Sequence, residues 1–269
     1  MDLAARLKAA GEPYVLATVV RTVSATAAKA GAKAVIQPDG TISAGWIGGG
    51  CARGAVLKAA REALGDGAPR LISVQPQDLL AAQGVSAGDE RDGIRFSRNM
   101  CPSKGTMDIF VEPVLPLPEL VICGTSPVAV ALADLAPRFD FEVTACAPVE
   151  EQQAIPAAVR RVEGYALEVA AGRERFLVVA TQGRGDEAAL RAALSVPAEY
   201  VAFVGSRAKT ASLRAKLEGG VPEARLDALH APAGLDIGAI TPEEIALSIL
   251  AEMVARRRRG QRTADAAEA

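Results

Sequence analysis

Three prolines stand within six residues near the middle of the chain, in the segment 112–118, which reads EPVLPLP. Proline fixes φ and lacks a backbone donor, so this segment is stiff and offers fewer hydrogen-bond donors to a sheet. A stiff connection is expected there, and 269 residues are enough for two domains of ordinary size. We therefore predict a small N-terminal domain over 1–115, a second domain over 119–262 and a frayed polar tail over 263–269.

After the prolines, short apolar runs alternate with helical patterns. Continuous apolar strands that alternate with helices are typical of a parallel sheet covered on both faces. The second half is therefore predicted to be an α/β domain with a Rossmann-like, doubly wound parallel sheet. The predicted strands are 119–123, 142–145, 176–180 and 200–204, and the predicted helices are 127–139, 186–194, 209–218 and 242–259.

Before the prolines, β-branched runs surround a glycine cluster and a single helical stretch. This pattern predicts a small α+β domain. Strands are expected at 14–22, 32–37, 71–74, 93–96 and 107–111, and a helix at 52–64 follows the loop 45–51.

Composition excludes several classes of protein. His230 is the only histidine, so multi-histidine metal sites are excluded. The four cysteines contain no C-x-x-C pair, which argues against zinc ribbons and thioredoxin-like motifs. A formal charge of −2 with few aromatic residues gives no reason to expect a nucleic-acid partner. No apolar run approaches the roughly 20 residues that a membrane span needs, and the N-terminus lacks signal-peptide features. We therefore expect a cytoplasmic protein with reduced thiols.

The first chemical candidate is the motif Gly48-Gly49-Gly50-Cys51 in front of the first-half helix. Glycines allow a ligand to approach the backbone closely, and a helix N-terminus directs N–H groups at an anion and favours a thiolate. Cys101 is a second candidate, because it stands in a polar loop close to Lys104. The alternatives are a plain turn with a buried Cys51 and an inert loop thiol at Cys101.

The turn after the first strand of the second half reads Gly124-Thr125-Ser126 and resembles a degraded dinucleotide-binding fingerprint, with Ser126 at the second glycine. The next strand ends at 145–148 (ACAP) without the acid that binds a ribose, although Glu150 and Glu151 follow closely. We therefore do not expect NAD binding of the usual kind.

Polar loops follow the next two predicted strands. Ligands of open α/β sheets bind at the carboxyl ends of the strands, where cations and backbone N–H groups can hold phosphate. Ordinary helix capping and solvated charge are the alternative. The residues concerned are Gln182, Arg184, Gly205, Ser206, Arg207 and Lys209. Further on, Thr241 with Pro242 and Glu244 predicts a capping box.

Taken together, these segments resemble the XdhC/CoxI family of maturation factors for molybdenum hydroxylases of the xanthine dehydrogenase and CO dehydrogenase types. The resemblance covers nearly the whole chain. It rests on the strings AGWIGGGCARG, CPSKGTMDIF, LVICGTSPVAV, YVAFVGSRAK and HAPAGLDIGAITPEE, of which the last is the most specific.

The resemblance implies a cofactor-binding chaperone, often a homodimer, rather than a catalyst with catalytic residues of its own. It implies binding of molybdopterin cytosine dinucleotide or a related nucleotide, sulfuration with a cysteine desulfurase, and insertion into a molybdenum hydroxylase apoenzyme. Cys51 and Cys101 would contact molybdenum or sulfur. The family usually has a G-S-x-P-R loop where this chain reads VSATA at 23–27, so Lys29 would replace the missing arginine. The implied cofactor-binding residues are Ser24, Lys29, Gly48, Gly49, Gly50, Cys51, Cys101, Gly124, Thr125, Ser126, Gln182, Arg184, Gly205, Ser206, Arg207 and Lys209.

Two alternatives stay open. The first is a nucleotide-dependent oxidoreductase or transferase with a Rossmann-like domain. The second is a ligand-free protein–protein scaffold for hydroxylase assembly. The degraded glycine turn and the missing acid argue against hydride chemistry with NAD, but the sequence does not decide between a carrier and a scaffold.

Overall fold

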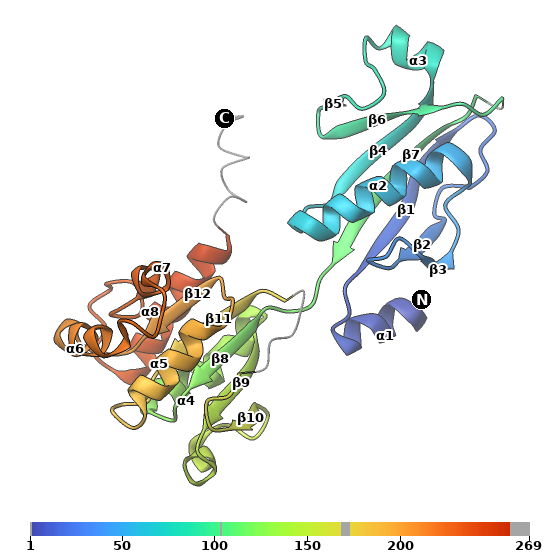
Figure 1. The fold of residues 1–269 in the computed structure, drawn as a ribbon. Coiled ribbons are helices and arrows are strands. Elements are labelled where there is room, and N and C mark those ends of the chain that lie inside the picture. Colours follow the sequence, from blue (N-terminus) through green and yellow to red (C-terminus); the bar gives the residue numbers. More distant parts are fainter. Residues whose placement is uncertain (1, 103, 168–172, 259–269) are drawn as a thin grey trace. The chain divides into compact units, whose positions relative to one another are not determined.

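The computed structural model describes residues 2–102, 104–167 and 173–258. The chain divides into two compact units, unit 1 over Met1–Pro116 and unit 2 over Leu117–Ala269 (Figure 1). Each unit has its own sheet and its own apolar core. The tail predicted over 263–269 lies outside the described residues.

Unit 1 is built on a mixed sheet with the strand order β3-β2-β1-β7-β4-β6-β5 among the described residues. Its neighbouring strands are antiparallel, apart from the parallel pair β4 and β6. The strands are β1 (Tyr14–Val23), β2 (Lys33–Ile36), β3 (Ile42–Gly45), β4 (Arg70–Pro76), β5 (Glu90–Arg91), β6 (Ile94–Asn99) and β7 (Thr106–Val114), and the helices are α1 (Asp2–Ala10), α2 (Gly50–Asp66) and α3 (Gln77–Ala82).

Helix α2 lies across one face of this sheet (Figure 1). Side chains alternate between the two faces of a strand, so Val15, Ala17 and Val19 of β1 all point to the helix side and are fully buried. The buried face of α2 consists of Ala52, Val56, Ala59, Ala60 and Ala63, whose small side chains allow the helix to approach the sheet closely. The predicted strand 14–22 is confirmed, although Val20 on its other face is half exposed.

The strand directions bring the loops that carry the glycine and cysteine motifs to one end of this sheet. Strands β1, β3, β4 and β6 end there and β7 begins there, as the antiparallel and parallel registers require. The segments 24–32, 45–50 and 99–105 therefore lie at the same end of the sheet.

Unit 2 is a fully parallel sheet with the strand order β10-β9-β8-β11-β12-β13 among the described residues. Counted along the chain, this is the order 3-2-1-4-5-6 of a Rossmann-type doubly wound sheet, so the predicted fold class is confirmed. Helices α4 and α8 cover one face and α5 and α6 the other. The strands are β8 (Glu119–Cys123), β9 (Glu142–Ala147), β10 (Arg160–Glu163), β11 (Arg175–Val179), β12 (Tyr200–Phe203) and β13 (Leu229–His230), and the helices are α4 (Pro127–Leu135), η1 (Ala136–Phe139), η2 (Val149–Ala154), α5 (Asp186–Ser195), α6 (Arg207–Leu217), α7 (Glu223–Asp227) and α8 (Pro242–Arg257).

Several polar residues of unit 2 cap helices. The hydroxyl group of Ser126 accepts from the backbone N–H of Ala129 at the start of α4, and Ser206 does the same for α6. Thr241 and Glu244 form the predicted capping box of α8. No helix in the described parts of the chain combines the length and apolar character that crossing a bilayer requires.

Candidate functional site

In unit 1, the glycine turn and the Cys101 loop meet at the end of the sheet. The backbone N–H of Met100 donates to Sγ of Cys51 over 3.4 Å. The backbone N–H of Cys101 donates to Oδ1 of Asn99 over 3.0 Å, and Nδ2 of Asn99 donates to the carbonyl of Gly105 over 2.6 Å. The two predicted cysteine motifs, 50 residues apart in sequence, therefore lie side by side.

A small cavity of about 60 Å³ opens between these loops. Its walls include Gly48, Gly49, Asn99 and Cys101, together with the segment 25–27. Gly48 has a φ of +98°, and a Cβ atom on Gly105 would stand 2.1 Å from the carbonyl oxygen of Ala25. Glycine is thus required for the close approach of the three loops.

Two further residues predicted for this site, Ser24 and Lys29, do not line the cavity. Both are exposed and flank the lining segment 25–27. Lys104 pairs with Asp78 over 3.2 Å, and both side chains are largely exposed. The described residues contain no group of three or more His, Cys, Asp or Glu side chains that could hold a metal ion. The thiols of Cys51 and Cys101 are therefore at most a two-member set of soft donors.

In unit 2, the turn after β8 lies against the end of β11. Gly124 has a φ of +111°, and a Cβ atom there would stand 2.6 Å from the carbonyl oxygen of Ala180 and 2.7 Å from Cα of Thr181. The fold itself thus requires glycine at this position. Beside the turn, the hydroxyl group of Thr125 donates to Oε2 of Glu151 over 3.0 Å.

Glu151 corrects part of the sequence interpretation. The strand β9 ends without an acid, as the sequence indicates, but the short helix η2 that follows brings the Glu151 carboxylate back to the glycine turn. Gln152 holds η2 in place, because its buried amide donates to the carbonyls of Ala147 (2.7 Å) and Val162 (2.8 Å). A carboxylate therefore stands beside the glycine turn, near the place where dinucleotide-binding domains carry the acid that binds a ribose. Two features of the sequence argue against NAD, the missing acid and Ser126 at the second glycine position. The position of Glu151 removes the first reason, and the second stands.

Two of the predicted phosphate-binding cations already have carboxylate partners. Nζ of Lys209 lies 2.5 Å from Oδ2 of Asp186. The other carboxylate oxygen, Oδ1, accepts from the hydroxyl of Thr181 and from the backbone N–H of Gly183. Burial alone would raise the pKa of Asp186, but these hydrogen bonds outweigh it and lower the pKa. Arg184 pairs with Glu151 at 3.5 Å and stays mostly exposed, so this second pair is easily opened.

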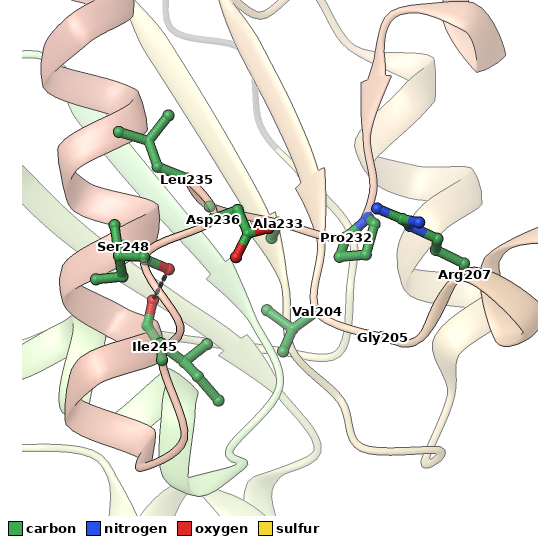
Figure 2. A pocket seen from close by; sticks show the side chains of 12 residues that line it. Val204, Gly205, Arg207, Pro232, Ala233, Leu235, Asp236, Ile245 and Ser248 are labelled. Carbon is green, nitrogen blue, oxygen red and sulfur yellow. Dashed lines mark hydrogen bonds between the residues drawn. The ribbon is translucent and has the colours of Figure 1, made fainter.

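The carboxyl ends of β12 and β13 form a larger cavity of about 540 Å³ (Figure 2). Gly205 and Arg207 after β12 contribute to it, as does the segment 232–237 after β13 and the first turns of α8. The string HAPAGLDIGA, which is the most specific part of the sequence resemblance, thus forms one wall of the cavity.

A partly buried network fixes this wall to the core of unit 2. The Glu252 carboxylate on α8 accepts from the hydroxyl of Tyr200 (2.6 Å) and the backbone N–H of Gly234 (2.9 Å), and it lies 2.6 Å from Nδ1 of His230. The rings of Tyr200 and His230 are in contact, with centroids 4.6 Å apart and ring planes tilted by 42°. Burial, and then the Glu252 carboxylate, raise the pKa of Tyr200 well above its usual range. The single histidine is therefore a structural residue in this arrangement.

The predicted site residues thus form three groups. In the first group, the turn 48–51 contacts the loop of Cys101 in unit 1. In the second, Thr125 of the glycine turn and Arg184 both contact Glu151. In the third, Gly205 and Arg207 line the cavity of about 540 Å³. Gln182 is exposed with a φ of +53°. Sequence reasoning missed the parts played by Asp186 and Glu252. A local sign was present only for Asp186, which stands at the first position of a predicted helix.

The fold and these groups of residues define a two-unit protein in which a cysteine-containing α+β unit is followed in the sequence by a Rossmann-type domain. Residues 120–253 match the family model described as the XdhC Rossmann domain, and residues 7–75 match the model described as the XdhC and CoxI family. The chain belongs to the XdhC and CoxI family, as the sequence resemblance predicts.

Among the proteins that are similar to the chain are two relatives and one solved structure. It is 30% identical over 261 residues to the uncharacterized protein YqeB of Escherichia coli K12, covering 93% of this chain and 45% of the relative. It is 30% identical over 162 residues to a probable xanthine dehydrogenase subunit from Bacillus subtilis 168, covering 57% of this chain and 47% of the relative. The chain therefore spans less than half the length of both relatives. A structure described as a xanthine dehydrogenase from Bacillus halodurans matches at 20% identity over 96% of each chain, with a TM-score of 0.47.

Proposed function

We propose that this protein is an accessory factor that binds molybdenum cofactor, as the cytosine dinucleotide or a related nucleotide, and delivers it to a molybdenum hydroxylase. Membership of the XdhC and CoxI family supports this role, as does the likeness to a probable xanthine dehydrogenase subunit. The observation that carries the proposal is the meeting of the Gly48–Cys51 turn with the Cys101 loop.

The donor set of unit 1 fits one end of such a cofactor. Thiols are soft ligands that suit molybdenum and sulfur, and glycines expose backbone N–H groups to an anion. The cavity of about 60 Å³ is far smaller than the several hundred Å³ that enclose an organic cofactor. Cys101, which lines the cavity, would therefore meet only the metal end, and Cys51 stands beside the Cys101 loop without lining the cavity. The protein would shield the metal end while a cysteine desulfurase supplies the terminal sulfur.

The test is to express the full chain with its hydroxylase partner and measure both retained cofactor and client activity. Mass spectrometry of the purified protein should identify a pterin nucleotide. Cys51→Ala and Cys101→Ala should each lower client maturation by about tenfold or more. Ser43→Ala, at an exposed position of β3 in the same unit, is the matched control and should leave maturation unchanged.

Different results would favour the other functions. If the purified chain binds neither the cofactor nor any cytosine or adenine dinucleotide, yet still retains the hydroxylase, it is a scaffold. Turnover of NAD(P)H with an acceptor would make it an oxidoreductase instead.

A further inference from the structure

Two of the four cysteines stand opposite each other in the parallel sheet of unit 2. Cys123 is the last residue of β8, and the strand register places Cys146 of β9 directly beside it. Both side chains belong to the apolar core on the side of α5 and α6, where the two residues are 0% and 1% exposed. Both are free thiols. The fold therefore holds two reduced sulfur atoms next to each other inside the domain.

The spacing of the strands suits a disulfide. Directly opposed residues on neighbouring strands have Cα atoms about 4.8 Å apart, within the range of about 4.4–6.8 Å that a disulfide spans. The thiols of Cys123 and Cys146 already hydrogen-bond to each other. Because their Cα–Cβ bonds run parallel instead of converging, a disulfide between them would be strained, and strained disulfides are readily reduced. A bond at this place would therefore form and break, and would not be a permanent crosslink.

The two thiols differ in access and in acidity. Cys146 lines a cavity of about 230 Å³ together with Arg160, whereas Cys123 lies behind it. A water molecule takes about 30 Å³, so the cavity has room for a hydroperoxide. The hydrogen bond from Cys123 lowers the pKa of the Cys146 thiol, against burial and the Glu119 carboxylate, and Arg160 acts in the same direction. The same hydrogen bond and complete burial raise the pKa of Cys123. This difference favours attack by Cys146 and leaves Cys123 as the second thiol.

We propose that Cys146 and Cys123 form a reversible disulfide when a hydroperoxide enters this cavity. The Cys146 thiolate attacks one peroxide oxygen and the O–O bond breaks, which leaves a sulfenic acid on Cys146 and releases water or an alcohol that carries the Cys146 proton. Sγ of Cys123 then attacks Sγ of Cys146, the S–O bond breaks, and the hydroxide leaves as water with the Cys123 proton. Two thiols and one hydroperoxide thus give one disulfide, one water and one further water or alcohol. This reaction does not depend on the proposed function.

The disulfide would act directly on the glycine turn after β8. The backbone N–H of Gly124 donates to the carbonyl of Cys146 over 2.9 Å, so the turn is attached to one of the two reacting residues. The carbonyl of Ala147, next to Cys146, accepts from the Gln152 amide that holds η2 and Glu151 in place. Drawing the two sulfur atoms together would move both strand ends. Oxidation should therefore loosen the glycine turn and the carboxylate beside it.

The first experiment uses the full-length reduced protein. It is treated with hydrogen peroxide, its remaining thiols are alkylated, and its peptides are identified by mass spectrometry. Peptides joined through Cys123 and Cys146 should appear, and dithiothreitol added to the native protein should restore both thiols. Oxidation should also make the amide hydrogens of the segment 124–126 exchange at least about threefold faster, whereas those of β12 should be unchanged.

Two sets of variants assign the sulfur atoms. The double variant Cys51→Ser/Cys101→Ser is the matched control, because it lacks the two more exposed thiols and should form the same disulfide. Its thiol count after denaturation should therefore fall from two to none on oxidation. Cys123→Ser should stop at the sulfenic acid on Cys146, which dimedone traps, and Cys146→Ser should trap nothing at Cys123. Thermal melts establish that each variant folds, and the peptide mapping of the wild type needs none of them.

Absence of the joined peptides from peroxide-treated wild-type protein would overturn the proposal, as would a disulfide that dithiothreitol reduces only after denaturation. Dimedone labelling of Cys123 in Cys146→Ser would contradict the order of attack. Unchanged exchange over 124–126 in the oxidised protein would refute the coupling to the glycine turn. Client maturation is measured separately on the reduced protein, so the proposed function and the disulfide can fail independently of each other.

Discussion

Nζ of Lys209 at the start of α6 lies 2.5 Å from Oδ2 of Asp186 at the start of α5. The carboxylate is buried and also accepts from Thr181 and from the backbone of Gly183. The Asp186 carboxylate therefore uses the lysine and the backbone N–H group that a bound phosphate would otherwise contact. Lys209 is therefore already paired in this structure, and a phosphate at this edge of the sheet has to compete with Asp186 for it.

Asp186→Asn should destabilise the protein in a pH-dependent way. The folded-state pKa of Asp186 is lower than its unfolded value, so its carboxylate stabilises the folded state above about pH 4 and this contribution is lost as the acid is titrated. We expect the variant to lose about 1–3 kcal/mol of unfolding free energy at pH 7 and much less near pH 3. Urea denaturation at both pH values measures this. A loss that is equal at both would contradict the assignment, and Asp134→Asn, in an exposed pair at 3.7 Å, serves as control.

Glu151→Gln should reduce discrimination between ribonucleotides and deoxyribonucleotides. A carboxylate beside the glycine turn can accept from both ribose hydroxyls, whereas an amide offers one weaker acceptor. Isothermal titration with CDP and dCDP should show a preference for CDP in the wild type that falls by about fivefold or more in the variant. Glu150→Gln, at the exposed neighbouring position, should behave as wild type. If the wild type does not distinguish the two nucleotides, Glu151 is only a partner of Arg184.

Gly124→Ala should destabilise unit 2 more than Gly164→Ala. Both glycines have positive φ values, at +111° and +69°, but only a Cβ atom on Gly124 would meet backbone atoms at under 3 Å. The alanine at Gly164 carries the cost of the backbone conformation alone, about 1 kcal/mol. At Gly124 the collision with β11 adds to it, and we expect a total of about 3 kcal/mol or more. Equal midpoints of chemical denaturation for the two variants would show that the turn can move away.

Of the four thiols, two should be reactive and two should be protected. Cys101 is exposed and Cys51 partly so, whereas Cys123 and Cys146 are buried side by side on β8 and β9. Hydrogen bonding to Cys146, together with burial, raises the pKa of Cys123 well above its usual range. Titration with a chromogenic disulfide should detect about two thiols in the native protein and four after denaturation. Cys101→Ser and Cys51→Ser should each remove one native equivalent, and reaction of Cys123 before unfolding would contradict this placement.

The central strands of both sheets could be predicted from the sequence. The strands β8, β11 and β12 are buried on both faces and therefore form continuous apolar runs. In β1, buried and more exposed residues alternate. The strands β10 and β13 could not be predicted in this way. The strand β10 reads RRVE and lies at the edge of its sheet, where charged residues are tolerated, and β13 has only two residues. Neither carries enough apolar residues for a periodic signal.

The chemistry-bearing motifs could be predicted individually, but their partners could not. The glycine turn before α2 and the loop of Cys101 are local patterns, and the strand directions bring them together. The pairing of Lys209 with Asp186, by contrast, joins residues at the starts of two different helices. The return of Glu151 depends on a short helix whose anchor, Gln152, has no sequence signature. Charge neutralisation at a site is decided by tertiary structure, so a basic loop in a sequence is weak evidence for phosphate binding.

The Glu252 carboxylate joins the wall of the large cavity to the core of unit 2 through Tyr200, His230 and Gly234. Opening the cavity and loosening the domain are consequently linked equilibria: whatever fills the cavity also raises the melting temperature of unit 2. Substitution of Glu252, which does not line the cavity, would in turn change ligand affinity without touching the ligand. In this domain, thermal stability is therefore a readout of occupancy.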